Sequence, residues 1–248
     1  AVYEALPSNL MDAFATASTL KQRLGQRSTQ PKLAFSGERG SGHDVWVRAT
    51  SDQTNTSLIT GSSYSSNTWG LQAGLDIPAV QGENGVWILG ATVQAGQSSS
   101  TVDAIKGHGE IHAESFGVGG TLTWYGDNGT FFDIQGQTNF VTNHISSSAN
   151  GVLHEDAKSR ANLLSAEIGR TFSLGKGHSI VPQAQFTASH ISADKFTDSA
   201  GNEVAIGSHT RNKGRIGLAY DYAQQSVTGP TGNSFHAIAN ILHDFDGK

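Results

Sequence analysis

The sequence predicts an all-β protein, an antiparallel transmembrane β-barrel with one N-terminal α-helix in its lumen. Three observations predict this class. Apolar side chains alternate with polar or glycine residues over segments longer than the roughly five or six residues usual in soluble sheets. The polar faces of these segments carry many glycines and few lysines, and aromatic residues gather near the segment ends, as in the girdles of outer-membrane barrels. Helical periodicity is confined to the start of the chain.

The composition excludes several classes of protein. The 248 residues include 16 Lys and Arg against 21 Asp and Glu, a net charge of −5, without the basic patch of a nucleic-acid-binding protein. There is no cysteine, which excludes disulfides and thiolate metal sites. No apolar run reaches the length of about 18 residues that predicts a transmembrane helix, but a transmembrane strand needs only about 10 alternating residues. With 36% hydrophobic residues and 30 glycines, the chain is poor in the side chains that fill a large soluble core.

Residues 1–42 are predicted to be a linker that contains a pore helix over about 9–24. Ser8 or Asn9 can cap this helix after Pro7, and apolar residues then recur at three- to four-residue spacing. The residues expected to characterise the pore helix are Asn9, Leu10, Phe14, Leu20, Arg23 and Leu24.

Residues 43–248 are predicted to form the barrel. About nine segments alternate with the period of a strand, at 45–49, 69–77, 87–96, 115–124, 132–140, 164–172, 183–188, 215–222 and 235–241. Tight hairpin signals lie at 125–131 and 173–179, whereas long polar loops are expected at 51–67, 98–112 and 145–160. Short turns at one rim and long loops at the other are typical of outer-membrane barrels.

The central question is which face of these strands meets water. If the apolar face meets lipid, the lipid-facing residues are Trp69, Leu71, Leu75, Trp87, Leu89, Val93, Phe116, Leu122, Trp124, Ile134, Ile168, Phe186, Leu218 and Tyr220. The polar residues that then face the lumen are Arg48, Gln72, Asp76, Asp133, Gln135, Glu167, Gln183, Gln185 and Arg215. These charges would pair with one another or hold the helix, or would simply line a water-filled pore. Arg170 interrupts a lipid-facing row and is expected to extend to the headgroup region. The alternative, with the apolar face packed inside, is a soluble β-barrel or sandwich that acts as a binding module.

Two groups of residues suggest chemistry, and both are weak signals. His108, Glu110 and His112 share one face of a strand but lie in an expected surface loop, so a metal site is not predicted. A pool of possible protease residues has no spacing that fixes their mutual geometry, namely His144, His154, Asp156, His190 and Asp194. We therefore predict no enzyme activity, no catalytic residue, no cofactor and no metal, and keep an outer-membrane pore or barrel enzyme as the alternative.

The same residues resemble the C-terminal translocator, or β-domain, of classical monomeric autotransporters of the pertactin and AIDA-like type. The N-terminal segment VYEALPSNLMDAFATASTLKQRLGQR is similar to the pore helix of that family, and VWVR (45–48) and GLQAGLD (70–76) are similar to its first two strands. Its later hairpins resemble FGVGGTLTWYGDNGTFFDIQGQ, SAEIGRTFSLGKGHSIVPQAQF and GRIGLAY. The resemblance covers essentially the whole chain.

This resemblance implies a 12-stranded barrel in the outer membrane of a Gram-negative bacterium. Its function would be type V secretion, in which the domain carries an N-terminal passenger across the membrane and anchors it at the cell surface. The implied partners are the passenger in cis, the barrel-assembly machinery, periplasmic chaperones and outer-membrane lipid, without nucleic acid. The sequence departs from the family at ILHDFDGK, which lacks a terminal aromatic residue. We therefore expect about three strands to be missing, and further sequence or a partner strand to close the barrel.

A second departure concerns cleavage. In the branch of serine-protease autotransporters, an Asn-Asn pair in the pore helix is cut by the barrel itself. The matching positions here are Ser18 and Thr19. Because neither side chain can cyclise as asparagine does, we expect no self-cleavage at this site.

Overall fold

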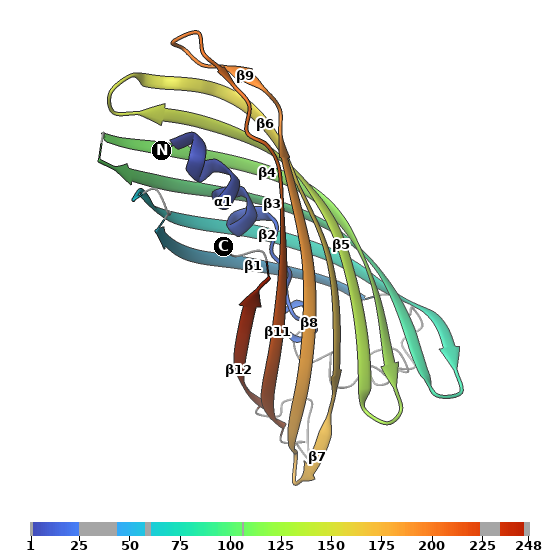
Figure 1. The fold of residues 1–248 in the computed structure, drawn as a ribbon. Helices are drawn as coiled ribbons and strands as arrows, with labels where there is room; N and C mark the ends of the chain where they lie inside the picture. Colours follow the sequence, from blue (N-terminus) through green and yellow to red (C-terminus); the bar gives the residue numbers. More distant parts are fainter. Residues whose placement is uncertain (1, 25–43, 58–60, 106, 224–233, 246–248) are drawn as a thin grey trace.

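A curved antiparallel sheet wraps around an N-terminal helical segment (Figure 1). The computed structural model describes residues 2–24, 44–57, 61–105, 107–223 and 234–245. The sheet order is β1-β2-β3-β4-β5-β6-β8-β11-β12, with β7 paired to β8 and with β9 and β10 in a separate ribbon. The strands are β1 (Asp44–Ser57), β2 (Ser63–Gly82), β3 (Gly85–Ala104), β4 (Gly107–Gly126), β5 (Thr130–Ser147), β6 (Gly151–Arg170), β7 (Phe172–Gly175), β8 (His178–Ala193), β9 (Phe196–Thr197), β10 (Glu203–Val204), β11 (Gly207–Ala223) and β12 (Ser234–Asp244). The predicted all-β antiparallel class is confirmed, and the main path has the predicted nine strands.

Two short helices replace the predicted single helix over 9–24. Helix α1 spans Val2–Phe14 and helix α2 spans Leu20–Leu24. Pro7, which the sequence placed before the helix, lies inside α1. Residues 15–19 leave the helical path because side chains of the sheet bind the carbonyl groups of this segment. The described residues contain no helix that is long and apolar enough to cross a bilayer.

Helix α1 lies near one end of the sheet, the α1 end, and helix α2 lies near the other, the α2 end. At the α2 end, tight turns join consecutive strands at 83–84, 127–129 and 176–177. At the α1 end, the connections are 58–62, 105–106, 148–150 and 194–206. Two of the predicted long loops, at 98–112 and 145–160, are therefore wrong, because strands fill most of both ranges. The third, at 51–67, is also mostly strand, with residues 58–60 outside the described part.

Strand β3 shows how the outward face changes from apolar to polar along its length. The outward positions of β3 are apolar from Trp87 to Ala95 and polar from Gln97 to Asp103. The inward positions of β3 are polar or glycine from Gly90 to Ser100, and Val102, near the α1 end, is fully buried. Apolar inward residues surround α1, whereas α2 faces both polar inward residues and a smaller apolar cluster, in which Leu20 packs with Ile88, Phe131 and Val181. The long loops were predicted wrongly for this reason. The two-residue period of the strand continues beyond the point at which its outward side chains become polar.

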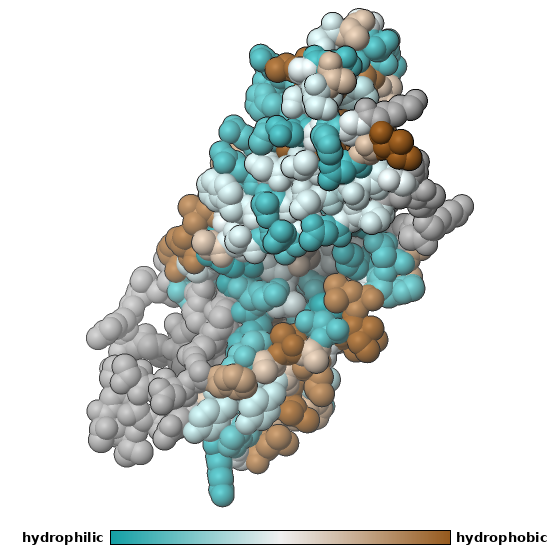
Figure 2. All heavy atoms as spheres, turned by 90° about the vertical axis from the view of Figure 1, so that its left-hand side faces the viewer, coloured by the Kyte–Doolittle hydropathy of each residue, from teal (hydrophilic) through white to brown (hydrophobic). Residues whose placement is uncertain are grey.

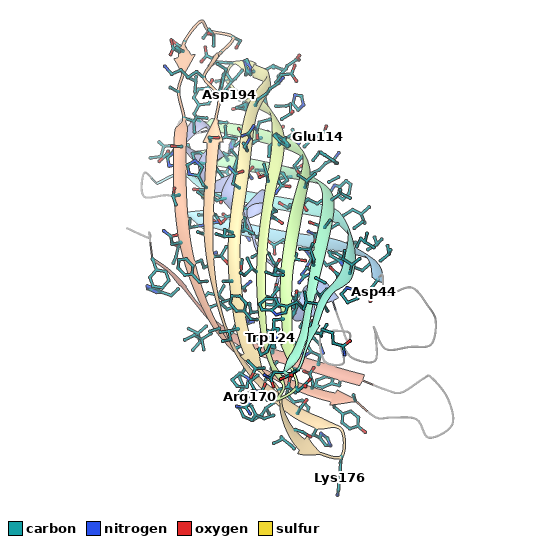
Figure 3. The ribbon with its side chains drawn as sticks, turned by 90° about the vertical axis from the view of Figure 1, so that its right-hand side faces the viewer. Asp44, Glu114, Trp124, Arg170, Lys176 and Asp194 are labelled. Carbon is teal, nitrogen blue, oxygen red and sulfur yellow. The ribbon has the colours of Figure 1, made fainter. Side chains whose placement is uncertain are left out.

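The molecular surface is also divided along its length. Figure 2, viewed from the side opposite to Figure 3, shows hydrophobic residues concentrated toward the lower half, with hydrophilic residues prevailing above. In Figure 3, Trp124 and Arg170 lie toward the α2 end of the sheet, and Glu114 and Asp194 lie toward the α1 end.

Candidate functional site

The lumenal surface of the sheet binds the N-terminal segment along its whole described length. In the α1 half, Leu6 and Leu10 are fully buried. They belong to one apolar cluster with inward residues from four strands, namely Val102, Ile111, Ile145 and Ile191. This half of the lumen resembles the core of a soluble protein, in which burial of apolar area provides the stabilisation.

Polar groups fix the position of α1 within that apolar cluster. The Nδ2 atom of Asn9 donates to hydroxyl oxygens of Ser66 and Ser98, at 3.2 and 3.4 Å, and also to Ser100. Asn9 is fully buried, so an axial shift of α1 would leave its amide without these acceptors. About one turn further along α1, Asp12 accepts from the Tyr64 hydroxyl and, at 2.7 Å, from Arg211.

The residues between the helices are bound through their backbone. The Asn139 side chain donates to the carbonyl oxygen of Phe14 at 2.7 Å, and Ser189 donates to that of Ala15 at 2.8 Å. These carbonyls no longer have the helical N–H partners that a continuous helix would supply. Side chains of the lumenal face of the sheet, here called the wall, therefore replace the hydrogen bonds of about one helical turn. This replacement explains the break in the predicted helix.

Ser18 is the most closely held residue of this connection. Its carbonyl oxygen accepts from Gln135 at 2.8 Å and from Gln185 at 3.2 Å, and its hydroxyl accepts from Arg48. Arg48 also donates to Gln72 at 2.8 Å. Donors from three separate strands, β1, β5 and β8, thus converge on one residue.

Thr19 begins α2 with a reciprocal capping box. The Gln22 amide N–H donates to the Thr19 hydroxyl at 3.1 Å, and the Thr19 N–H donates to the Gln22 side chain at 3.0 Å. The next orphan N–H, that of Leu20, donates to Glu167 at 2.8 Å, and Arg215 lies 3.1 Å from the other oxygen of that carboxylate. A buried anion at a helix start is stabilised by these N–H groups.

Arg23 carries the deepest charge network. Its Nη2 atom lies 2.5 Å from Asp133 and donates to Thr123 at 3.1 Å, and its Nη1 atom donates to Thr121 at 3.2 Å and lies 3.7 Å from Asp76. The Arg23 and Asp133 side chains are 1% and 0% exposed. Because an isolated buried charge is very costly, each of these charges depends on the other.

The structure brings most of the predicted lumenal residues into contact with the segment. Arg48, Asp76, Asp133, Gln135, Glu167 and Gln185 contact residues 18–23 directly. The other three predicted residues bind these contact residues or one another: Gln72 accepts a hydrogen bond from Arg48, and the Arg215 guanidinium donates to Gln185 at 2.9 Å. Arg215 also donates to Gln183, at 3.1 Å. Of the predicted helix residues, Asn9, Leu10, Phe14, Leu20 and Arg23 are all buried, and the side chain of Leu24 lies outside the described part.

The predicted lipid-facing residues lie on the outward face. Trp69, Leu71, Leu89 and Leu218 are 49–55% exposed and do not converge on an interior. The other large side chains of the set are also exposed, except Leu122, Trp124 and Ile134, which are partly buried between neighbours. Arg170 is exposed at the end of β6, with its guanidinium 5.1 Å from the centre of the Phe172 ring.

The sequence interpretation missed several residues of the site. The Thr19–Gln22 cap has a recognisable T-x-x-Q signal, whereas nothing local indicates that Asn139 and Ser189 bind carbonyl groups. It also missed Lys21, which lies 3.0 Å from Asp221.

The histidine groups behave as outward surface residues. His112 lies 3.7 Å from Glu110 with both side chains more than half exposed, and His108 contacts Asp103. Within the described residues no three His, Asp or Glu side chains come together as metal ligands. The pool that the sequence offered for a protease is spread over several strands and connections, and His144, the residue opposite His112 in the sheet, is exposed.

Comparison with known proteins gives a consistent result. The family model described as "Autotransporter beta-domain" matches residues 45–248. The adhesin BmaC autotransporter of Brucella suis is 31% identical over 259 residues, covering 99% of this chain and 8% of the relative. The pertactin autotransporter of Bordetella bronchiseptica is 23% identical, covering 94% of this chain and 24% of the relative. The chain therefore spans only a small part of the length of these curated relatives.

Solved structures share the fold. The β domain of the Bordetella autotransporter BrkA has a TM-score of 0.68 at 22% identity, covering 83% of this chain and 81% of that one. The transport unit of AIDA-I from Escherichia coli has a TM-score of 0.66 at 17% identity, covering 90% of this chain and 78% of that one.

Proposed function

Because this chain belongs to the autotransporter β-domain family, we propose that its lumenal wall holds residues 2–24 as a fixed segment whose N-terminal end faces the cell exterior. The chain is an outer-membrane β-barrel translocator of type V secretion in a Gram-negative bacterium. In our proposal the domain comprises a linker over 1–42 and the barrel over 43–248. The passenger would precede residue 1 and remain attached to the barrel through the lumenal segment.

The observation that carries this proposal is the capture of the backbone of residues 14–18 by wall side chains. A segment held through its carbonyl groups is bound whatever its own side chains are, which suits a chain that has been threaded through the lumen. The direction of the segment also supports the proposal. Val2 packs against Gly109 near the α1 end, whereas Arg23 lies among charges near the α2 end.

The outward face suits lipid over the α2 half of the sheet. In β3 and β4 the apolar outward stretches run from Trp87 to Ala95 and from Phe116 to Trp124, nine residues each counted along the chain. A tilted strand of about 9–11 residues spans a bilayer core. We propose that these stretches and their neighbours contact acyl chains, and that the polar outward positions beyond them project outside the membrane.

The partners follow from this arrangement as proposals. They are a passenger in cis, the barrel-assembly machinery and periplasmic chaperones for insertion, and outer-membrane lipid. Among the described residues β1 and β12 each pair on one side only, so we propose that further strands or a partner strand complete the barrel. The role needs no enzymatic step, and we propose that the Ser18–Thr19 bond stays intact, because the Thr19 hydroxyl is engaged as a helix cap. A single uncleaved band for the full-length protein is the expected result.

Surface labelling tests the direction of the segment. An epitope placed directly before Val2 should be accessible to antibody on intact cells. The matched control carries the same epitope in the 127–129 turn, and should be labelled only after permeabilisation. Labelling of the turn, but not of the N-terminal epitope, on intact cells would overturn the proposed orientation.

A further inference from the structure

The outward face carries a pair of cations at the α1 side of its apolar region. Lys158 and Arg160 lie two residues apart on β6 and are both exposed. In the sheet register, Arg160 lies between Phe140 of β5 and Ser192 of β8. These residues line a hollow of about 800 Å³ on the outward surface. A concave surface with two adjacent cations is suited to an anionic group.

Among the described residues, neither cation forms an ion pair with a carboxylate. Within the described part of the chain, no ion pair involves Lys158 or Arg160, and the Arg160 guanidinium lies 5.1 Å from the centre of the Phe140 ring. Two carboxylates also line the hollow, Glu114 and Asp194, both labelled in Figure 3. Asp194, which directly follows β8, is the cross-strand neighbour of Lys158, and Glu114 lies in the same row on β4. Glu114 accepts a hydrogen bond from Gln97 at 3.2 Å. The described part of the Arg160 row, with Phe140 and Ser192, carries no carboxylate, so an external anion would bind on the Arg160 side of the hollow with Lys158 beside it.

A second hollow, of about 490 Å³, lies next to the first toward the α2 end. Gly136, Leu164 and Ala188 form one cross-strand row along it, two rows from Arg160 in the sheet register. A side chain at Gly136 would meet nothing within 4 Å, so this part of the surface is open. Between this row and the cations lies a polar row in which Thr138 donates to Asn162 at 3.0 Å. We refer to these two neighbouring hollows together as the groove, which is largely apolar in the second hollow and carries the two cations in the first.

The position of the groove matches a membrane border. Arg160 and Arg170 lie on the same strand and each stacks on a phenylalanine ring at 5.1 Å. Ten residues at about 3.3 Å each, on a strand tilted by about 40°, correspond to about 25 Å across the bilayer, the height of an outer-membrane apolar band. Arg170 then marks one headgroup region and Arg160 the other.

We propose that this groove binds a phosphorylated glycolipid of the outer leaflet, with Lys158 and Arg160 on a phosphate group and an acyl chain along Gly136, Leu164 and Ala188. The assignment to the outer leaflet rests on the proposed orientation of the segment. Arginine and lysine together offer several donors to phosphate oxygens, and charge-assisted hydrogen bonds of this kind are among the strongest.

Lipid binding by the full-length protein in a nonionic detergent tests the proposal. The probe is purified diphosphorylated lipid A, and the readout is the number of lipids retained in native mass spectrometry as lipid concentration increases. The double variant Lys158→Gln/Arg160→Gln should bind about tenfold more weakly or worse, because hydrogen bonds to charged groups contribute about 1.5–3 kcal/mol. The matched control, Arg170→Gln/Lys176→Gln at the other border, should bind as the unchanged protein does.

Three results would overturn the proposal. They are equal affinity of the Lys158/Arg160 variant, equal affinity for the dephosphorylated lipid, and full displacement of the lipid by millimolar inorganic phosphate, which would indicate a site for the free ion. Gly136→Leu provides an independent test, because it fills the open hollow and should also weaken binding. Surface labelling of the N-terminal epitope measures the orientation of the lumenal segment independently of lipid binding. If the N-terminal epitope is not labelled on intact cells but phosphate-dependent lipid binding is retained, the groove still binds a phosphorylated lipid, and the assignment to the outer leaflet is overturned.

Discussion

The two halves of the lumen hold the same segment by different physical means. Around α1, Leu6 and Leu10 pack among apolar side chains, with Asn9 bound to serine hydroxyls. Around α2, Arg23 and Glu167 are buried among charged and amide side chains, and Leu20 packs in a smaller apolar cluster. The apolar half gains free energy in proportion to the area buried and tolerates graded change. The charged half tolerates substitution poorly, because removal of one charge leaves its partner buried without a counter-charge.

This difference suggests a division of labour between the halves. Burial of matched charges adds little net stability, but it strongly disfavours any register in which the charges are not matched. We infer that the α1 half supplies most of the binding free energy, and that the α2 half determines where the segment stops. The variants below separate the two contributions.

The largest effect is expected for Arg23→Leu. This change leaves Asp133 buried without its cation and should lower the free energy of unfolding by about 3–5 kcal/mol. Thermal unfolding in detergent, followed by heat-modifiable mobility on gels, measures the loss. The double variant Arg23→Leu/Asp133→Leu should recover part of it, and Arg170→Leu is the exposed control with little effect. If the double variant is no more stable than the single one, the charges are not coupled.

The next effect is expected for Leu10→Ala in the apolar half. Leu10 is fully buried, so truncation should leave a cavity and cost about 3 kcal/mol. Unlike the Arg23 variant, it has no compensating partner substitution, and Leu10→Met should be nearly neutral. A loss as large for Leu10→Met as for Leu10→Ala would contradict an adaptable apolar packing.

A smaller effect is expected for Gln135→Leu, which removes one of the two amide donors to the Ser18 carbonyl. Gln185 still donates to that oxygen, but Gln135 also donates to the buried Asp133 carboxylate at 2.9 Å, so the cost should be about 2 kcal/mol. The change should also increase amide hydrogen exchange in residues 15–19 more than in α1. Equal increases along the whole segment would show that the connection is not held locally.

The smallest effect is expected at the α1 end and depends on pH. Backbone N–H groups, first that of Asn202, hold the pKa of the exposed Asp198 carboxyl below its ordinary value. A carboxyl with a lowered pKa in the folded state stabilises the fold at neutral pH, and this contribution disappears as the pH falls through the lowered pKa. The amide chemical shifts of Ala200 and Asn202 should follow that titration, and should be flat in Asp198→Asn. A midpoint above the ordinary range for aspartate would contradict the sign.

The predictability of this structure differs between the two halves as well. The polar inward residues of the α2 half, such as Asp133 and Glu167, stand out against an apolar alternation and are visible in the sequence. In the α1 half, inward residues such as Val102 and Ile111 alternate with polar outward residues, which is the pattern of an ordinary soluble strand. Read locally, that pattern gives no sign that it continues a membrane strand, so the sequence interpretation placed loops there.

The helix break was unpredictable for a different reason. The spacing of Leu10, Phe14 and Leu20 fits a continuous helix, and no glycine or proline interrupts it. The break is imposed by tertiary donors such as Asn139 and Ser189, which come from strands more than a hundred residues away in the sequence. Only the Thr19–Gln22 box gives a local signal, as a second helix start.

A disulfide test measures most directly whether the wall encloses this segment. The chain has no cysteine, so paired substitutions report only the designed contact. Asn9→Cys with Ser100→Cys should cross-link almost completely in the outer membrane, because these side chains are in contact inside the lumen. Asn9→Cys with Ser99→Cys, whose side chain points outward to His112, should not cross-link. Equal cross-linking of the two pairs, or none in either, would contradict a lumen filled by residues 2–24.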